Sequence, residues 1–263
     1  MTEPVAAART AREQIPPVTE AERAVADALA IEVDPRRARE VLARVPLWFH
    51  TFALNRRDGL YTPGVARDHR YRLPVFPERL DGRRVLDVGT FDGFYAFLAE
   101  ARGAQRVLAV DNEQYVDWVR ARWGIELEGG EGFRAIADLL SSSVEYLRTD
   151  AFELGALDER FDLVICFGML HRVVDPLGLL RILRARLADG GQVLLETHGA
   201  PDADPPQPVI EVFGPGQVYG GDDYVWWGFT PAGLDRLAVC AGFTGLTLAD
   251  APMIDGHLRL IGT

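Results

Sequence analysis

The sequence contains no lysine, and all 28 of its basic residues are arginines. Lysine forms Schiff bases with carbonyl substrates and binds phosphate in P-loops, so both of these chemistries are excluded. The abundance of alanine, arginine, glycine and leucine is typical of a high-GC coding bias and indicates no particular chemistry.

Cysteine and long apolar runs are also scarce. Cys166 and Cys240 provide neither a disulfide framework nor metal-ligand spacing, which fits a reducing compartment. No apolar run reaches the roughly 18 residues of a membrane-spanning helix. Residues 1–17 lack the apolar segment of a signal peptide. We therefore expect a cytoplasmic protein with no metal site and no membrane association.

Positive charge is outnumbered, because 39 acidic residues against 28 arginines give a formal net charge of −11. This balance makes a nucleic-acid partner unlikely, since phosphate contacts need concentrated positive charge, although it leaves room for a local basic groove. A chain of 263 residues, 48% of them hydrophobic, can bury a large core. Its length suits one large domain, or one domain with an appendage.

The chain divides into three parts. Residues 1–17 are expected to form a flexible tail, residues 18–80 an N-terminal helical and aromatic cap, and residues 81–263 the main domain. Within the cap, the capping box at Thr19 and Glu22 predicts one helix, and Asp34 followed by proline predicts a second.

Strands and helices are expected to alternate after residue 81. The predicted strands are 84–88, 106–110, 144–147, 161–167, 192–196, 244–248 and 257–261, and the predicted helices are 93–102, 114–123, 133–140, 176–187 and 230–241. This pattern predicts an α/β fold of the Rossmann-like, doubly wound kind. Its seven-stranded sheet is expected to be mostly parallel, with an antiparallel last strand.

A long insertion, residues 199–229, follows the fifth predicted strand and is rich in proline, glycine and aspartate. One interpretation is a segment that merely packs on the core. We favour a lid that covers a substrate, because long loops in α/β folds lie over binding sites and the aromatic content argues against disorder.

The strongest motif is the segment 85–93, Val-Leu-Asp-Val-Gly-Thr-Phe-Asp-Gly, which joins the first predicted strand of the main domain to its first helix. Such a turn lies at the carboxyl edge of a doubly wound sheet, where ligands bind. Gly89 allows close approach of a ligand to the backbone, and Gly93 begins a helix whose amides face that ligand. A dinucleotide turn prefers a third glycine, so a nicotinamide dehydrogenase is the least favoured enzyme.

Aspartates follow successive strands of the predicted sheet. Asp87, at the head of the motif, suits a ligand that carries an ammonium group. Asp111 ends the second strand, where it can bind ribose hydroxyls, and Asp150 follows the third, where it can accept from an adenine amino group. The series fits S-adenosylmethionine, and ordinary strand-end capping is the alternative.

The sequence resembles the class I S-adenosylmethionine-dependent methyltransferases. Within them it resembles the group of tRNA wobble-uridine carboxymethyl-transferases and their small-molecule relatives. The resemblance covers most of residues 46–245 and is carried mainly by the segments 48–50, 58–64, 85–97, 161–176 and 193–197. It implies that S-adenosylmethionine is the cofactor. Motif and resemblance together give the candidate cofactor-binding residues Asp87, Gly89, Thr90, Phe91, Gly93, Asp111, Asn112, Asp150, Ala151, Phe167 and His171.

Two departures from the resembled group bear on whether the cofactor donates a methyl or a carboxymethyl group. Its carboxymethyl-transferring members hold the extra carboxylate of their modified cofactor with lysines, and they carry a tyrosine near Leu170-His171-Arg172. Arginine can replace lysine in charge but not in geometry. We therefore expect a plain methyl donor.

Two histidines lie at strand ends on the ligand side and are the candidate catalytic bases, His171 and His198. Histidine titrates near neutrality and can take a proton from an acceptor hydroxyl. For His171 a role as cofactor wall is an equal alternative, and for His198 a structural role.

The candidate substrate-binding residues are expected to come from the cap and the insertion. They are Trp48, His50, Arg57, Tyr61, Tyr219, Trp226 and Trp227. Arg56 and Arg57 can meet a carboxylate, or they can form a solvated surface pair.

We expect methyl transfer to a small molecule, with a hydroxyl of a secondary metabolite favoured as the acceptor. Modification of a tRNA wobble uridine, by methyl or carboxymethyl transfer, is the alternative. A cofactor-binding protein without turnover is the second alternative, and a homodimer is compatible with the sequence.

Overall fold

The computed structural model describes residues 17–66, 69–200, 206–214, 217, 224–249, 253–254 and 257–262. The expected tail, apart from Pro17, and the candidate substrate residue Tyr219 lie outside these described residues. No helix in the described part is long and apolar enough to cross a membrane.

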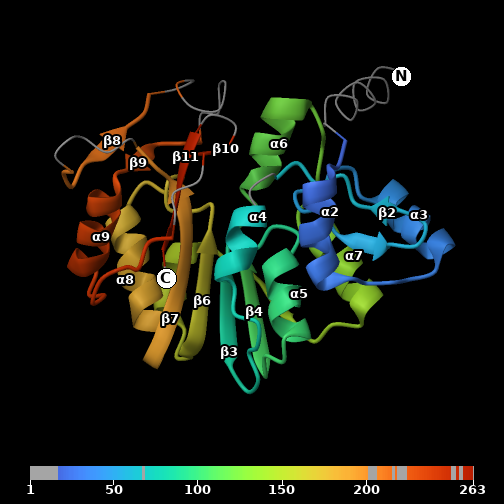
Figure 1. The fold of residues 1–263 in the computed structure, drawn as a ribbon, viewed down its shortest axis with the longest axis horizontal. Coiled ribbons are helices and arrows are strands. Elements are labelled where there is room, and N and C mark those ends of the chain that lie inside the picture. Colours follow the sequence, from blue (N-terminus) through green and yellow to red (C-terminus); the bar gives the residue numbers. More distant parts are fainter. Residues whose placement is uncertain are drawn as a thin grey trace.

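A twisted sheet forms the centre of the molecule (Figure 1). Its five parallel strands are β3 (Arg84–Val88), β4 (Arg106–Asp111), β5 (Glu145–Arg148), β6 (Phe161–Phe167) and β7 (Leu187–His198). They lie in the order β7-β6-β3-β4-β5. Beyond β7 the sheet continues antiparallel with β11 (His257–Gly262) and then β10 (Met253–Ile254). The five parallel strands confirm the expected Rossmann-like sheet.

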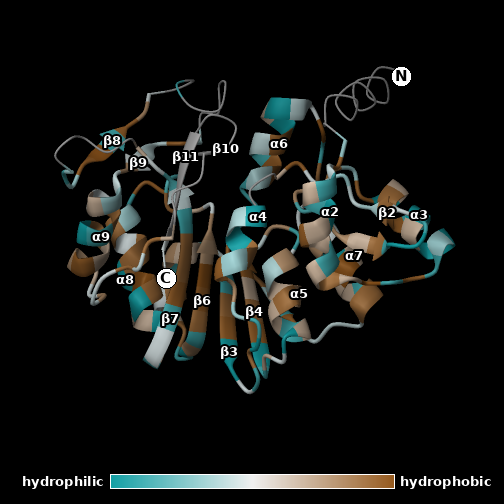
Figure 2. Ribbon diagram, in the orientation of Figure 1, coloured by the Kyte–Doolittle hydropathy of each residue, from teal (hydrophilic) through white to brown (hydrophobic). Residues whose placement is uncertain are grey.

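Helices cover both faces of this sheet, as a doubly wound fold requires. Alternate residues of a strand enter different cores, with Val85 on the face of α5 and α7 and Leu86 on the face of α8 and α9. Because the strands are buried on both faces, their middle parts are apolar (Figure 2). The helices are α5 (Phe94–Ala101), α6 (Tyr115–Trp123), α7 (Glu131–Leu140), α8 (Pro176–Arg186) and α9 (Pro231–Cys240), and a 3-10 helix, η3, spans Ala151–Ala156.

The cap packs on the face of α5 and α7. It contains α2 (Glu20–Ala26), η1 (Asp27–Leu29), α3 (Pro35–Arg44), β1 (Ala53–Asn55), β2 (Leu60–Tyr61), α4 (His69–Arg72) and η2 (Leu73–Val75). The capping box is confirmed, since Thr19 Oγ1 accepts from the Glu22 N–H while the Thr19 N–H donates to Glu22 Oε2. The antiparallel pair β1–β2 lies in a region that the sequence predicted to be irregular.

Two other predictions differ from the structure. The strand predicted at 244–248 is reduced to one bridge between Leu248 and Gly262. Gly242 and Gly245 hold φ values of +97° and +144°, so the chain cannot run extended there. Within the insertion, β8 (Ile210–Val212) pairs with β9 (Trp227–Phe229), an antiparallel ribbon that the sequence did not predict.

Candidate functional site

The turn between β3 and α5 forms the base of the site. Gly89 has φ +79°, and its N–H donates to Val110 O at 2.8 Å, which ties the turn to β4. A Cβ on Gly89 would lie 2.6 Å from the Met169 sulfur, so a larger residue would have to displace Met169 and hold a φ that favours glycine. Phe91 also holds a positive φ, +51°, which is a strained conformation for a residue with a side chain.

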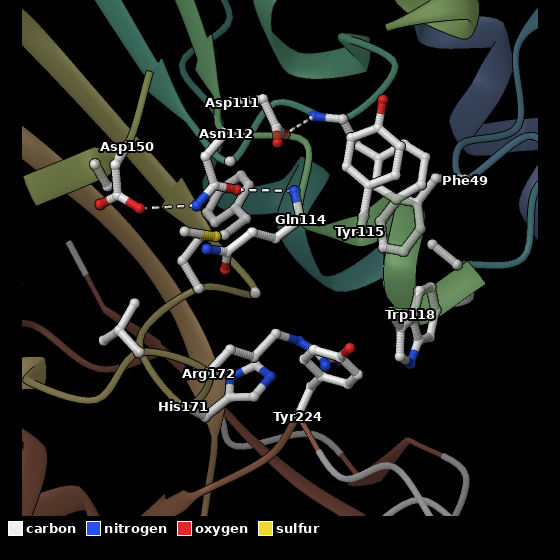
Figure 3. A pocket seen from close by; sticks show the side chains of 18 of the residues that line it. Phe49, Asp111, Asn112, Gln114, Tyr115, Trp118, Asp150, His171, Arg172 and Tyr224 are labelled. Carbon is white, nitrogen blue, oxygen red and sulfur yellow. Dashed lines mark hydrogen bonds between the residues drawn. The ribbon is translucent and has the colours of Figure 1, made fainter. Parts of the chain in front are cut away.

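Asp111 closes this turn from the end of β4. Its carboxylate accepts from the Phe91 N–H at 2.8 Å (Figure 3). It also accepts from the Glu113 N–H at 2.7 Å. Burial raises the pKa of Asp111 to about 6, against the lowering effect of these two bonds. A carboxylate has about four acceptor positions, so Asp111 can still accept from the hydroxyls of a ligand.

Asp150 lies across from Asp111 at the same edge of the sheet. Its side chain accepts from Asn112 Nδ2 and from the Phe152 N–H, both at 2.9 Å.

Asp87 is placed differently from Asp111 and Asp150. It is buried beneath the turn and accepts from the Thr90 hydroxyl at 2.7 Å. Burial raises the pKa of Asp87 to about 6.

A cavity of about 510 Å³ opens above the turn, a size typical of cofactor and small-molecule sites. Eight of the expected cofactor residues line it: Gly89, Phe91, Asp111, Asn112, Asp150, Ala151, Phe167 and His171. The other three, Asp87, Thr90 and Gly93, lie behind the lining and shape the turn.

The two candidate catalytic histidines occupy different positions. His171 lines the cavity, and its Nδ1 accepts from the backbone N–H of His198 at 3.2 Å and lies 3.2 Å from the Thr197 hydroxyl. His198 is buried behind it and packs against Phe213, and it is not among the lining residues. A backbone N–H can only donate, so Nδ1 of His171 carries no proton and the neutral ring holds its proton on Nε2.

The expected substrate residues are not brought together in the cavity. Trp48 is buried in the core, Tyr61 donates to Asp27 at 3.0 Å, and Arg57 is exposed. Arg56 pairs with Glu32 on the cap surface. None of these four lines the cavity.

Trp226 and Trp227 also lie outside the lining but adjoin it. The backbone N–H of Trp226 donates to His171 O at 2.9 Å, and Trp227 Nε1 donates to Val173 O at 2.7 Å. From the same segment, Tyr224 does line the cavity.

His50, a further expected substrate residue, instead joins the cap to the turn. Asp92 accepts from the N–H of Phe49 at 2.8 Å and of His50 at 2.9 Å, and it also contacts His50 Nδ1. This arrangement places Phe49 in the wall of the cavity, where it stacks on Phe91 at 4.5 Å.

Sequence reasoning missed Arg72. Its side chain is 4% exposed, lines the cavity and pairs with Glu196 at 2.5 Å, with its guanidinium 5.3 Å from the Phe167 ring centroid. It also missed the lining residues of α6, Tyr115, Trp118, Arg122 and Trp123. The one local signal in the sequence was a helix with three aromatic residues after the Asp111 strand.

Comparison with known proteins places this geometry in a family. A methyltransferase domain model matches residues 59–247. The tRNA U34 carboxymethyltransferase of Campylobacter hominis is 30% identical over 45% of this chain and 37% of that protein. The ubiquinone biosynthesis O-methyltransferase of Psychrobacter arcticus is 30% identical over 68% of this chain and 65% of that protein. The chain thus spans about a third to two thirds of the length of these curated relatives.

Solved structures agree in fold. The N-terminal domain of EvdMO1 with SAH bound has a TM-score of 0.57 at 21% identity, covering 88% of this chain and 96% of that one. An S-adenosylmethionine-dependent methyltransferase from Mesorhizobium loti has a TM-score of 0.51 at 18% identity, covering 75% and 96%. The chain belongs to the methyltransferase domain family, and its class is that of the S-adenosylmethionine-dependent methyltransferases.

Proposed function

We propose that this protein transfers the methyl group of S-adenosylmethionine to a hydroxyl of a small-molecule acceptor, a secondary metabolite, in the cytoplasm. The observation that carries the proposal is the cavity itself. Its lining runs from the glycine turn and Asp111 to an aromatic wall made by Phe49 and α6. One cavity thus offers both a place for the cofactor and room for a small acceptor.

The lining residues fit the cofactor. Asp111 would accept from the ribose hydroxyls, and the pair Asn112 and Asp150 would meet the adenine. The backbone at Gly89 would lie against the methionine portion, because no Cβ intervenes. Arg72 lines the cavity and would meet the cofactor carboxylate. It would take the part that the sequence suggested for Arg56 and Arg57, since Arg56 pairs with Glu32 on the cap surface.

The bound cofactor supplies a methyl group activated by a positively charged sulfur. The acceptor hydroxyl would receive this methyl group and would lose its proton to water, and the residues of the cavity would hold the acceptor in place beside the cofactor. The protein contributes mainly position, which lowers barriers by as much as about 7–11 kcal/mol. Because Nδ1 of His171 accepts from the His198 N–H, we assign His171 to the wall of the cavity rather than to the role of the base.

We further propose that the insertion at 199–229 acts as the lid. Its described part touches the site at two points: Tyr224 lines the cavity, and Trp226 is bonded to the backbone of His171. His198 then acts through its backbone N–H, which orients His171.

The test combines cofactor binding with turnover. Calorimetry should show binding of S-adenosylhomocysteine to the wild type and its loss, by tenfold or more, in Gly89→Ala. The matched control is Gly82→Ala, which also has a positive φ, +70°, but has no atom within 4 Å of its added Cβ. An acceptor panel with radiolabelled S-adenosylmethionine then measures transfer. Absence of cofactor binding would refute the proposal, and tight binding without turnover would favour a non-catalytic protein.

A further inference from the structure

Glu113 is a buried acid that lies beside the cofactor cavity without lining it. It comes just after β4, and its side chain is 3% exposed. Its backbone N–H donates to Asp111 Oδ1 at 2.7 Å, while the Phe91 N–H donates to Asp111 Oδ2 at 2.8 Å. Each oxygen of the Asp111 carboxylate thus accepts from one backbone donor, and Glu113 supplies one of the two.

The backbone of Glu113 makes this contact from a left-handed conformation, with φ +61°. Residues with a side chain rarely adopt this conformation, and glycine, asparagine and aspartate adopt it more readily than glutamate does. A strained residue of this kind persists only where its surroundings hold it. The contacts of the Glu113 side chain therefore bear on the orientation of the Asp111 carboxylate.

Two segments hold the Glu113 side chain. From β5, the Tyr146 hydroxyl donates to Glu113 Oε1 at 2.9 Å, and Arg148 Nε lies 2.9 Å from Oε2 in an ion pair. From the turn before α7, Gly129 and Gly130 approach so closely that a Cβ on Gly129 would lie 2.6 Å from Glu113 Cδ. Both glycines have a positive φ, +91° and +69°. The long side chain thus connects the end of β4 to β5 and to this turn.

We propose that Glu113 is a positioning residue for cofactor binding. Its anchored side chain keeps its own backbone left-handed, and the backbone N–H then fixes the orientation of Asp111 toward the ribose. The inference rests on the proposed function, because the contact of Asp111 with the ribose belongs to that proposal. Glycine adopts the left-handed conformation without a side chain, so Glu113→Gly should preserve what Glu113→Ala removes.

The experiment measures the affinity of these two variants for S-adenosylhomocysteine by calorimetry. Glu113→Ala should bind about tenfold more weakly than the wild type, because the bound state must restore a left-handed residue. Glu113→Gly should stay within about threefold of the wild type. A carboxylate that acted only through its own contacts would be missed equally in both variants, since both variants lose it.

The matched control is the same pair of changes at Glu32. This residue is also a glutamate with a positive φ, +55°, and it also pairs with an arginine, Arg56. It lies in the cap and does not line the cavity, so neither Glu32→Ala nor Glu32→Gly should change the affinity. Urea unfolding shows whether each variant is folded.

A second readout follows the charge of Glu113. Burial raises the pKa of Asp111 most, and the negative charges of Glu113 and Asp87 raise it further. Glu113→Gln removes one of these charges and keeps an oxygen for Tyr146, so the pKa of Asp111 should fall. The loss of S-adenosylhomocysteine affinity on acidification should then move to lower pH than in the wild type. The other ionisable groups around this pair stay in place, and they are Tyr115, Glu131, Arg134, Tyr146 and Arg148.

The outcomes separate the inference from the proposed function. Equal affinities of Glu113→Ala and Glu113→Gly, weaker binding by Glu113→Gly, or an unchanged pH profile in Glu113→Gln would overturn the inference. If Glu113→Ala fails to fold, Glu113→Gly decides alone, and a loss beyond about threefold would overturn the inference. No binding of S-adenosylhomocysteine by the wild type would instead refute the proposed function.

Discussion

Asp111 combines two roles in one side chain. It holds the strained Phe91 turn through a backbone bond, and it faces the cavity where a ribose would lie. Both roles need acceptor oxygens, so both depend on the carboxylate being ionised. Burial raises its pKa to about 6, which places the loss of that charge only slightly below neutral pH.

We therefore predict that affinity for S-adenosylhomocysteine falls as the pH falls through 6. Above 6 Asp111 is ionised and accepts from the hydroxyls. Below 6 it binds a proton, and affinity should drop by up to about tenfold per pH unit. Calorimetry between about pH 5 and pH 8 measures this. Asp111→Asn should bind weakly with little pH dependence. Asp87→Asn should keep the pH dependence, because Asp87 does not line the cavity. A flat wild-type profile would contradict the assignment.

At the scale of elements, the cap is attached to the main domain through Asp92, which lies just before α5. That carboxylate accepts from two backbone N–H groups, those of Phe49 and His50, and contacts the imidazole of His50 as well. Gly132 of α7 allows the close fit, since a Cβ there would lie 2.8 Å from the Asp92 Cβ. The position of Phe49 in the cavity wall follows from this attachment.

Asp92→Ala should destabilise the fold by about 2–5 kcal/mol, because it leaves two N–H groups without the carboxylate acceptor, one of them in a buried residue, His50. Urea unfolding measures the loss, and hydrogen exchange at Phe49 and His50 should show it locally. Asp58→Ala, at an exposed cap position, is the control and should change stability by less than about 0.5 kcal/mol. If the two variants were equally stable, Asp92 would not be the attachment.

For the whole molecule, net charge bears on the choice between a small acceptor and tRNA. The formal net charge of the chain is −11, and the chain has no lysine. The positively charged residues in the described cavity lining are a few arginines. Nucleic-acid binding draws most of its affinity from phosphate contacts and the counterions they release. The homology to tRNA-modifying proteins makes this alternative worth a direct test.

We predict that the protein does not retain bulk tRNA at about 0.15 M salt, close to physiological ionic strength. Filter binding or gel shift measures this, with the Campylobacter hominis tRNA U34 carboxymethyltransferase as the positive control. Retention that weakens steeply as salt rises would favour the tRNA alternative over the small-molecule acceptor.

The sequence by itself determined the central sheet, and it predicted the glycine turn and the aspartates that the structure places in the cavity lining. Local signals carry these features: apolar strand runs, the glycine turn at 89–93, and aspartates where strands end. In a parallel sheet the carboxyl ends of strands share one edge, so order along the chain already places Asp111 near Asp150.

Only the tertiary structure decided the rest. Arg72, Trp118 and Tyr224 meet in one cavity although they come from the cap, α6 and the insertion, and no spacing in the sequence relates them. Trp48 and Tyr61 matched the aromatic pattern expected of a substrate site. In the structure Trp48 is buried in the core, and Tyr61 donates a hydrogen bond to Asp27. An aromatic side chain gains free energy wherever it is buried, so packing between distant segments, and not residue type, selects which rings face the acceptor.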